Sequence, residues 1–141
     1  MSLFFTPQLP QIIALLKHAT LPTADLKEPL RAAFFACGQT DQPSGIVGLE
    51  IYGPIALLRS LAVHADCRGH GMAKALISHA ESQAMQRGAN KIYLLTTSAH
   101  ALFLSQNYAL ISRASVPAAI KNSSQFAALC PANATVLFKS I

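Results

Sequence analysis

Two long apolar runs joined by a single Gly-Pro pair constrain the fold of this chain most strongly. The first run covers residues 45–52 and the second covers 55–63, with only Gly53 and Pro54 between them. Apolar runs of this length, bounded by turn residues, are typical of buried strands. A two-residue connection that contains glycine suits a tight antiparallel hairpin. We therefore expect two adjacent antiparallel strands over 45–52 and 55–63.

Further strand-like and helix-like segments alternate on either side of this hairpin. The other strand-like segments are 2–6, 30–38, 91–97, 108–112 and 134–141. The helix-like segments are one that begins at Pro7, then 72–87, 99–107 and 117–129. Segment 30–38 also has a helical interpretation, but the turn residues that follow it favour a strand and a hairpin loop. This order predicts an α/β fold.

The composition is that of a compact globular domain. Apolar residues make up 52% of the 141 residues and charged residues only 12%, which excludes an intrinsically disordered chain. The length suits one domain with its own core. We therefore expect a single α/β domain over residues 1–141.

Charge and targeting signals narrow the classes of partner. Lys and Arg number 11 against 6 Asp and Glu, a balance that favours anionic ligands. The basic residues are scattered singly, without interleaved aromatic residues, so we expect no nucleic-acid partner. No apolar run approaches the roughly 18 residues of a membrane span. The N-terminal segment lacks the basic start of a signal peptide, and Pro7 and Pro10 interrupt it.

Cysteine and histidine usage points to an intracellular protein without a metal site. Cys37, Cys67 and Cys130 are odd in number and form no CxxC pair, which is typical of free thiols in a reducing compartment. The five histidines have no spacing that indicates a metal site. We therefore expect a cytoplasmic protein with no membrane partner and no bound metal.

The stretch RGHGMAKAL, residues 68–76, lies between the second strand of the hairpin and a helix. The first turn of a helix has unpaired N–H groups and partial positive charge, so it attracts phosphate. Gly69 and Gly71 let the backbone approach a bulky anion, and Arg68 adds charge. The stretch has neither the Gly-Lys-Ser/Thr of a P-loop nor a dinucleotide fingerprint. On its glycines alone, it is equally compatible with a tight strand–helix turn.

Residues 68–73 read Arg-Gly-His-Gly-Met-Ala and resemble the R/Q-x-x-G-x-G/A motif of the GNAT family of N-acetyltransferases. The order of the surrounding segments is similar to that family over most of the chain. The resemblance implies the GNAT fold, a central mixed, mostly antiparallel, twisted sheet of about six to seven strands with helices on both faces. It also implies that the fourth and fifth strands, here 55–63 and 91–97, splay apart around the thioester of acetyl-CoA.

The resemblance assigns the cofactor acetyl-CoA to one run of backbone. In the family, the amides of the motif hold the pyrophosphate, and the strand before it offers backbone hydrogen bonds to the pantetheine arm. The cofactor-binding residues implied in this way are Leu61, Ala62, Val63, Arg68, Gly69, His70, Gly71, Met72, Ala73 and Lys74, with Phe103 from segment 99–107.

Acetyl transfer to an amine needs a base for the amine proton and a donor for the carbonyl oxygen as it becomes anionic. The backbone N–H of Val63 is our candidate donor. The glutamate that many relatives carry on the fourth strand is missing, but alternation puts Glu50 on one face with Gly48 and Tyr52. Glu50 is therefore the candidate base. A water chain as base, or an ordinary cross-strand pair between Glu50 and Arg59, are the alternatives.

Two arginines are candidates for binding an anionic substrate. Arg59 interrupts an apolar strand, which is costly unless its charge has a partner. A guanidinium suits planar bidentate anions, so we assign Arg59 to the substrate, with the pair to Glu50 as the alternative. Arg113, together with Lys121, is the second candidate, and solvated surface charge is the alternative for both.

The usual catalytic acid of the family, a tyrosine in the fourth helix, has no counterpart here. Alignment of FLSQNY, residues 103–108, with the family pattern Y-x-x-x-G-F puts Phe103 at that position. Asn107 then replaces the glycine, and Tyr108 replaces the final phenylalanine. Phe103 cannot donate a proton, so we expect the coenzyme A thiolate to leave unassisted or with help from water.

A narrower resemblance concerns the substrate. Segments 21–26, 52–63, 68–71, 93–97 and 126–132 together look like the arsenic-resistance-associated branch of the family. In the wider group of that branch, amino-acid-like arsenicals or phosphinic acids are N-acetylated. The resemblance implies a small anionic, amino-acid-like amine as substrate, in arsenic or toxicant resistance. It also admits a homodimer, which is common for this fold. A non-catalytic acyl-CoA-binding module and an interaction protein built on the same scaffold stay open.

Overall fold

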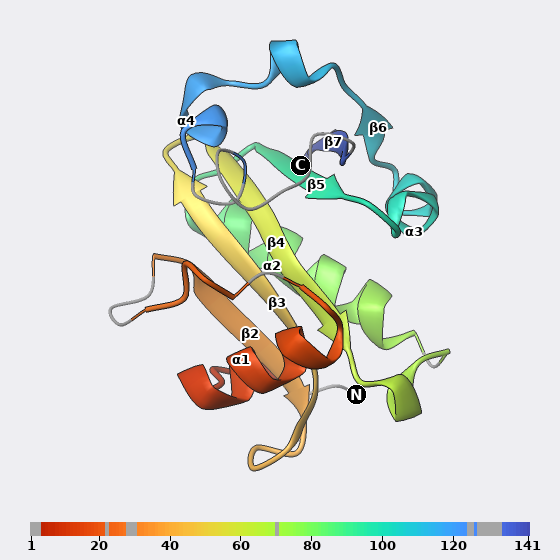
Figure 1. Cartoon of the computed structure of the whole chain (residues 1–141). Helices are drawn as coiled ribbons and strands as arrows, with labels where there is room; N and C mark the ends of the chain where they lie inside the picture. The colour runs from red at the N-terminus through yellow and green to blue at the C-terminus, as the bar shows by residue number, and fades with distance from the viewer. Residues whose placement is uncertain (1–3, 22, 28–30, 70, 124–125, 127–133) are drawn as a thin grey trace.

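The structure is a computed structural model, and it describes residues 4–21, 23–27, 31–69, 71–123, 126 and 134–141. The strands of the described part (Figure 1) are β1 (Phe4–Phe5), β2 (Ala33–Gly38), β3 (Pro43–Tyr52), β4 (Ile55–Val63), β5 (Lys91–Thr96), β6 (Ala109–Leu110) and β7 (Thr135–Ser140). The helices are α1 (Leu9–His18), α2 (Met72–Gln86), α3 (His100–Ser105) and α4 (Ala118–Lys121), with 3-10 turns at Ala65–Cys67 and Arg113–Ser115.

All of these strands form one sheet in the order β1-β2-β3-β4-β5-β7-β6. Every neighbouring pair is antiparallel except β4 and β5, which run parallel. The prediction of a mixed, mostly antiparallel sheet of six to seven strands is therefore confirmed. The predicted hairpin is also confirmed, because β3 and β4 pair from Tyr52 and Ile55 onward around the turn at Gly53, whose φ is +65°.

The parallel pairing of β4 with β5 is short. The two strands are in register only at Ile55, Ala56 and Leu57, opposite Lys91 to Tyr93. From Leu58 to Val63, β4 continues without a partner from β5, and β5 turns to β7 along its whole length, Lys91 to Thr96. The predicted splay between the fourth and fifth strands is therefore present, and it opens toward the carboxyl ends of both strands.

Helices cover both faces of the sheet (Figure 1). On one face, α2 packs Leu76, Ile77 and Ala80 against Val47 and Leu49 of β3. The expected helix over 72–87 is confirmed as α2, which begins at Met72 and ends at Gln86.

The opposite face carries α1, whose Ile12 and Leu16 pack against Phe34 and Ile46. The alternation of β3 thus sends its even and odd residues to different helices. The middle of the second face is occupied by polar side chains, which are described below.

The last predicted helix is interrupted after its first turn. Helix α4 ends at Lys121, whereas we expected a helix through residue 129, and Asn122 and Ser123 form a turn and a bend. The side chain of Ser123 donates to the carbonyl of Ile120 at 2.6 Å and accepts the N–H of Phe126 at 3.3 Å. Such side-chain bonds compete with helical backbone bonds. Phe126 is again in a helical conformation, and apart from it the remainder of the expected helix lies outside the described residues.

Gly48 on β3 gives a test of how tightly the sheet is packed around the polar side chains. A Cβ at this position would lie 2.9 and 3.0 Å from two ring atoms of Phe34 and 3.1 Å from Cγ of Arg59. Phe34 is buried in the α1 cluster, so its ring has little room to move. We expect Gly48→Ala to lower the free energy of unfolding by about 1–3 kcal/mol, measured by urea denaturation.

The matched control is a double-mutant cycle with Phe34→Leu, which removes the ring edge. Gly48→Ala should cost less in that background than in the wild-type chain. If Gly48→Ala lowered the unfolding free energy equally in the two backgrounds, the Phe34 ring would not be what crowds a side chain at position 48.

Candidate functional site

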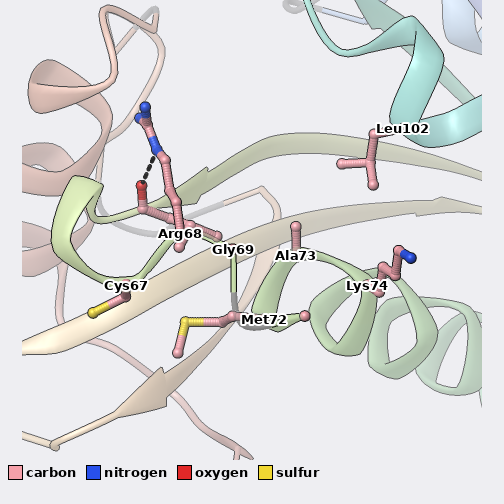
Figure 2. Close-up of a pocket in the computed structure, with 9 residues that line it drawn as sticks. Cys67, Arg68, Gly69, Met72, Ala73, Lys74 and Leu102 are labelled. Carbon is pink, nitrogen blue, oxygen red and sulfur yellow. Dashed lines mark hydrogen bonds between the residues drawn. The ribbon is translucent and has the colours of Figure 1, made fainter.

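A cavity of about 230 Å³ lies where β4 leads into α2 (Figure 2). Leu102 of α3 closes the cavity from the side opposite the first turn of α2. The residues that line it are Val63, Cys67, Arg68, Gly69, Gly71, Met72, Ala73, Lys74 and Leu102.

Both glycines of this connection have backbone conformations that side chains disfavour. The φ angles are +84° at Gly69 and +77° at Gly71, which is the N-cap residue of α2. Among the described residues, and leaving aside the chain neighbours of each glycine, no atom lies within 4 Å of the position that a Cβ would take at either residue. The positive φ angles explain the glycines in a tight turn. The open space above them additionally leaves the backbone accessible to a bulky ligand.

The electrostatics of the cavity favour an anion. Helix α2 is 15 residues long and has no acidic residue in its first turn, so its unpaired N–H groups and dipole act without a competing carboxylate. Lys74 adds a cation to the lining. The Nε of Arg68 donates to the carbonyl of Val63 at 3.2 Å, which folds this guanidinium against the end of β4 (Figure 2).

Most of the residues that the sequence assigns to cofactor binding lie together here. Those that line the cavity are Val63, Arg68, Gly69, Gly71, Met72, Ala73 and Lys74. His70 lies outside the described residues, and Leu61 and Ala62 belong to β4 just before the lining begins. Their contacts with a cofactor stay predictions.

Phe103 does not line this cavity. It is buried and packs edge-on against the ring of Tyr108, with the ring centroids 5.4 Å apart. Its neighbour Leu102 takes the place in the cavity wall. Sequence reasoning missed Leu102 because alignment to the family pattern fixes only the position of the absent tyrosine. The glycine position of that pattern is filled by Asn107 with φ +72°, and asparagine tolerates this conformation better than most residues.

A β-bulge interrupts β4 before the cavity. Ser60 and Leu61 of β4 together face Val47 of β3, because the register shifts between the pairs Ile46–Ala62 and Gly48–Arg59. Ser60 has a φ of +60°. A bulge bends its strand and re-aims the groups beside it.

Beyond the bulge, backbone groups of β4 face the gap toward β5. The N–H of His64 donates to the carbonyl of Ser44 at 2.7 Å, on the β3 side. Because successive N–H groups of a strand point to opposite edges, the N–H of Val63 points away from β3. It is therefore directed to the side on which this part of β4 pairs with no strand of the described residues.

A cluster of buried charges forms the second feature of the site. The guanidinium of Arg59 contacts Asp25 through both terminal nitrogens, and Nη2 lies 3.0 Å from Oδ1 of Asp25. Its Nη1 also donates to Oε2 of Glu50 at 3.0 Å, and its Nε donates to Oγ of Ser60 at 3.0 Å. All three nitrogens of Arg59 are therefore engaged, and its side chain is only 2% exposed.

The carboxylate of Glu50 is engaged on both oxygens. Oε1 accepts a short hydrogen bond from the hydroxyl of Tyr52, and Oε2 accepts from Arg59. Burial, this hydrogen bond and the charge of Glu50 raise the pKa of Tyr52 to about 12. Burial lowers the pKa of the Arg59 guanidinium, but the hydrogen bonds and charges of Asp25 and Glu50 outweigh it and raise this pKa.

The cluster contains the cross-strand pair between Glu50 and Arg59 that the sequence offers as an alternative to catalysis. Asp25 was missed, since it lies in the turn-rich connection from α1 to β2, 34 residues before its partner, with no periodic pattern around it. The roles of Glu50 as base and Arg59 as substrate ligand stay predictions.

The second candidate substrate ligand, Arg113, lies in the 3-10 turn before α4. Its Nη2 donates to the carbonyl of Ala134 at 3.3 Å, and its guanidinium lies 4.9 Å from the ring centroid of Phe126. Lys121 donates to the carbonyl of Ala114 at 2.9 Å. The bond from Arg113 to Ala134 joins this turn to the residue before β7, and a substrate contact of Arg113 stays a prediction.

Two findings bear on other kinds of site. Within the described ranges, no three His, Cys, Asp or Glu side chains are grouped so that they could hold a metal ion. No helix in that part of the chain has the length and apolar character needed to cross a membrane.

The raised pKa of Tyr52 predicts how stability depends on pH. Because the folded chain holds the phenol proton up to about pH 12 and a free tyrosine titrates near 10.0, the stabilising contribution is complete below pH 10. It is lost as the pH rises from 10 toward 12, where the unfolded chain binds fewer protons. We expect Tyr52→Phe to flatten the fall in unfolding free energy over pH 9.5–11, measured by urea denaturation.

A second tyrosine gives the comparison. Burial and Glu81 also raise the pKa of Tyr108, so the double variant Tyr52→Phe/Tyr108→Phe should show a still flatter profile. Identical slopes in Tyr52→Phe and the wild-type chain would contradict the coupling of Tyr52 to Glu50.

Comparisons with known proteins agree with this architecture. The family described as acetyltransferase (GNAT) matches residues 7–108 of the chain. No curated protein sequence shows significant similarity to it. Among solved structures, N-acetylglutamate synthase from Neisseria gonorrhoeae, complexed with coenzyme A and N-acetyl-glutamate, superposes with a TM-score of 0.81 at 16% identity. The match covers 99% of this chain but only 35% of the synthase.

Two other solved structures match over nearly their whole lengths. Rv2747 from Mycobacterium tuberculosis, in complex with CoA and NLQ, has a TM-score of 0.73 at 15% identity, covering 99% of both chains. An acetyltransferase from Streptococcus agalactiae has a TM-score of 0.75 at 14% identity, covering 99% of this chain and 98% of that one. At identities this low, the TM-scores show a shared fold and nothing more. With the family match over residues 7–108, the chain belongs to the GNAT family of acetyltransferases.

Proposed function

We propose that this protein is an acetyl-CoA-dependent N-acetyltransferase that acetylates a small amine. The observation that carries the proposal is the cavity at the start of α2, where two exposed glycine backbones lie beside the open side of β4. A tight turn would account for the glycines, but it would not require an open anion-attracting cavity at the same point.

The residues of this cavity suit the pyrophosphate of coenzyme A. The N–H groups of the first turn of α2 are unpaired, and Gly69 and Gly71 leave room for the phosphates to approach them. Arg68 and Lys74 supply two cations for a doubly charged pyrophosphate. Neighbours that were crystallised with coenzyme A share the fold.

The open side of β4 suits the pantetheine arm. At a rise of about 3.3 Å per residue, β4 runs roughly 13 Å from Val63 at the cavity back to Arg59. That distance is comparable with the length of an extended pantetheine arm. Because β5 leaves β4 after Leu57, an arm that follows β4 would end beside the bulge at Ser60 and the charge cluster.

Acetyl-CoA supplies the activated acetyl group, and the chain supplies positions for a proton and for developing charge. The N–H of Val63, which points away from β3, is the candidate donor to an oxygen that becomes anionic. Glu50 is the candidate base, but each of its oxygens already accepts one hydrogen bond and its side chain is only 3% exposed, so few of its acceptor sites are open to an amine proton. A water molecule is therefore an equally suitable acceptor for the amine proton. Phe103 provides no acid for the departing thiolate.

The acceptor in this proposal is a small anionic, amino-acid-like amine. Arg59 at the end of the pantetheine path is the charge that would select it. The neighbour from Neisseria gonorrhoeae was solved with N-acetyl-glutamate. Amino-acid-like arsenicals and phosphinic acids belong in the screen because of the resemblance to the arsenic-resistance-associated branch. Of the segments that carry this resemblance, residues 22, 70 and 127–132 lie outside the described residues.

A second candidate function is acyl-CoA binding without transfer. Two observations favour it, since both oxygens of Glu50 are already hydrogen-bonded and a phenylalanine stands where the family often has its acid. Cofactor binding without turnover of any amine would support this second candidate.

The first experiment is calorimetric titration of the purified protein with acetyl-CoA, with desulfo-CoA and ATP as controls. We expect saturable binding of acetyl-CoA and desulfo-CoA and much weaker binding of ATP, followed by thiol release on addition of a suitable amine. If acetyl-CoA did not bind, the assignment of the cavity to coenzyme A would be wrong, and the proposed acetyltransferase activity would be wrong as well.

A charge placed in the cavity tests the position of the pyrophosphate. Ala73 lies in the first turn of α2 with helical geometry and lines the cavity, so a longer side chain here causes no backbone strain. We expect Ala73→Glu to weaken acetyl-CoA binding at least tenfold more than Ala73→Gln, because only the carboxylate repels phosphate and neutralises the helix terminus. Calorimetry measures both affinities.

The glutamine variant is the control for bulk. Equal losses in the two variants would show that size alone blocks the cavity. If both variants bound acetyl-CoA as tightly as the wild-type chain, the pyrophosphate would not bind in this cavity.

A further inference from the structure

The charge cluster contains one carboxylate more than its arginine requires. Arg59 carries one positive charge, whereas Asp25 and Glu50 each carry a negative charge when ionised. A buried guanidinium needs one well-placed partner to avoid an uncompensated charge. Glu50 provides that partner from β3, on the inner side of the cluster, where its side chain is 3% exposed. Arg59 would therefore stay neutralised if Asp25 left.

The two carboxylates are held very differently. Glu50 lies in the middle of a strand that is paired on both sides, and Tyr52 donates to it as well. Asp25 belongs to the connection between α1 and β2, in a turn, and its side chain is 16% exposed. The described hydrogen bonds of its carboxylate go to Arg59 alone. Rotation of the Asp25 side chain toward solvent breaks those bonds without disturbing the sheet.

The backbone beside Asp25 has an anchor of its own. Leu26 is buried in the cluster under α1, and its N–H donates to the carbonyl of Thr23 at 3.0 Å. The segment therefore keeps its place when the side chain of Asp25 turns away. The exchangeable part of the cluster is the carboxylate, not the loop.

The geometry of the Asp25 contact is that of a bound ligand. Both carboxylate oxygens face both terminal nitrogens of Arg59, the paired arrangement in which a guanidinium binds a planar anion. Gly48 makes this possible, since Cγ of Arg59 passes close to where a side chain at that position would lie. The guanidinium is thereby presented beside the bulge of β4, at the end of the proposed pantetheine path.

We propose that Asp25 is an internal competitor that occupies, on Arg59, the place of the acceptor carboxylate. An amino-acid-like acceptor binds by exchanging its carboxylate for that of Asp25, which rotates into solvent. The exchange replaces one anion by another, so the charge of the buried cluster is unchanged and Arg59 never loses both partners. The competition selects acceptors with a planar anionic group and weakens their binding by the strength of the Asp25 contact. This inference rests on the proposed acetyltransferase function.

The test compares acceptors that differ only in the carboxylate. Acetylation of L-amino acids and of the matching L-amino-acid amides is followed by thiol release for the wild-type chain and Asp25→Asn. Removing the charge of Asp25 should lower the KM for the acids about tenfold, which corresponds to the loss of one charge-assisted contact of about 1.4 kcal/mol. The KM for the amides and for acetyl-CoA should not change.

Asp41→Asn is the matched control, because it removes the same charge from the exposed turn between β2 and β3. It should leave every KM unchanged. If Asp25→Asn instead raises the KM for acids and amides alike, or leaves that for the acids unchanged, Asp25 is a structural ion-pair partner and the proposal fails.

Two further outcomes separate this proposal from the function on which it rests. If acetyl-CoA binds but no amino acid is acetylated, the exchange is overturned while cofactor binding stands. If acetyl-CoA does not bind, both are overturned.

A measurement on the wild-type chain covers the case in which Asp25→Asn does not fold. The sequence has only three aspartates, Asp25, Asp41 and Asp66, so their carboxyl carbons can be resolved by carbon-13 NMR. Saturation with an accepted amino acid should move the Asp25 signal toward that of Asp66, whose side chain is 89% exposed. An unmoved signal would overturn the exchange.

Discussion

The arrangement of the site depends on one interrupted pairing, in which β4 and β5 are in register at three positions and then part. Parallel strands share backbone hydrogen bonds, so each position where they part leaves polar groups without a strand partner. Here β5 finds its second partner in β7 along its full length, and β4 keeps β3. The edge of β4 that remains open is therefore flanked by two stable ladders. The free N–H and C=O groups of such an edge can form hydrogen bonds with the amide groups of another molecule. The cavity lined by Gly69 and Gly71 begins where that edge ends, at Val63.

The second constraint is the cost of placing a guanidinium inside a sheet face. Arg59 is 4% exposed among apolar neighbours, and an unpaired charge there would be strongly destabilising. Two carboxylates compensate this charge. Glu50 lies on β3 of the same sheet, and Asp25 lies in the more exposed connection between α1 and β2. Removing the Glu50 carboxylate would disturb Tyr52 and the β3 ladder, whereas removing the Asp25 carboxylate disturbs only a turn. This asymmetry, rather than the number of ion pairs, makes the position interesting for ligand binding.

How much the sequence predicts depends on whether the deciding contacts are local. Alternation along β3 places Glu50 on the same face as Gly48 and Tyr52, diagonally opposite Arg59 of β4. The strand register is therefore enough to predict the ion pair between Glu50 and Arg59. The glycine loop is likewise a local pattern. Asp25 lies 34 residues before Arg59, in a segment without periodicity. The sequence therefore contains no pattern that predicts the contact between the two side chains. The interruption after α4 has a similarly particular cause, because Ser123 bonds to backbone groups that a continuous helix would otherwise use. The place of Leu102 in the cavity depends on how α3 packs, which a family pattern does not contain.

Both proposed binding functions are carried by one strand, and this has a physical consequence. The cavity begins at Val63, the guanidinium stands at Arg59, and the bulge at Ser60 lies between them. A paired strand transmits position well, since its length is set by backbone geometry. The distance between the end of the cavity at Val63 and the guanidinium of Arg59 is then set by β4. An acceptor in which the spacing of the amine and the anionic group matches the distance from the thioester to Arg59 is favoured over one that is merely charged, so the strand selects by shape where the cluster selects by charge.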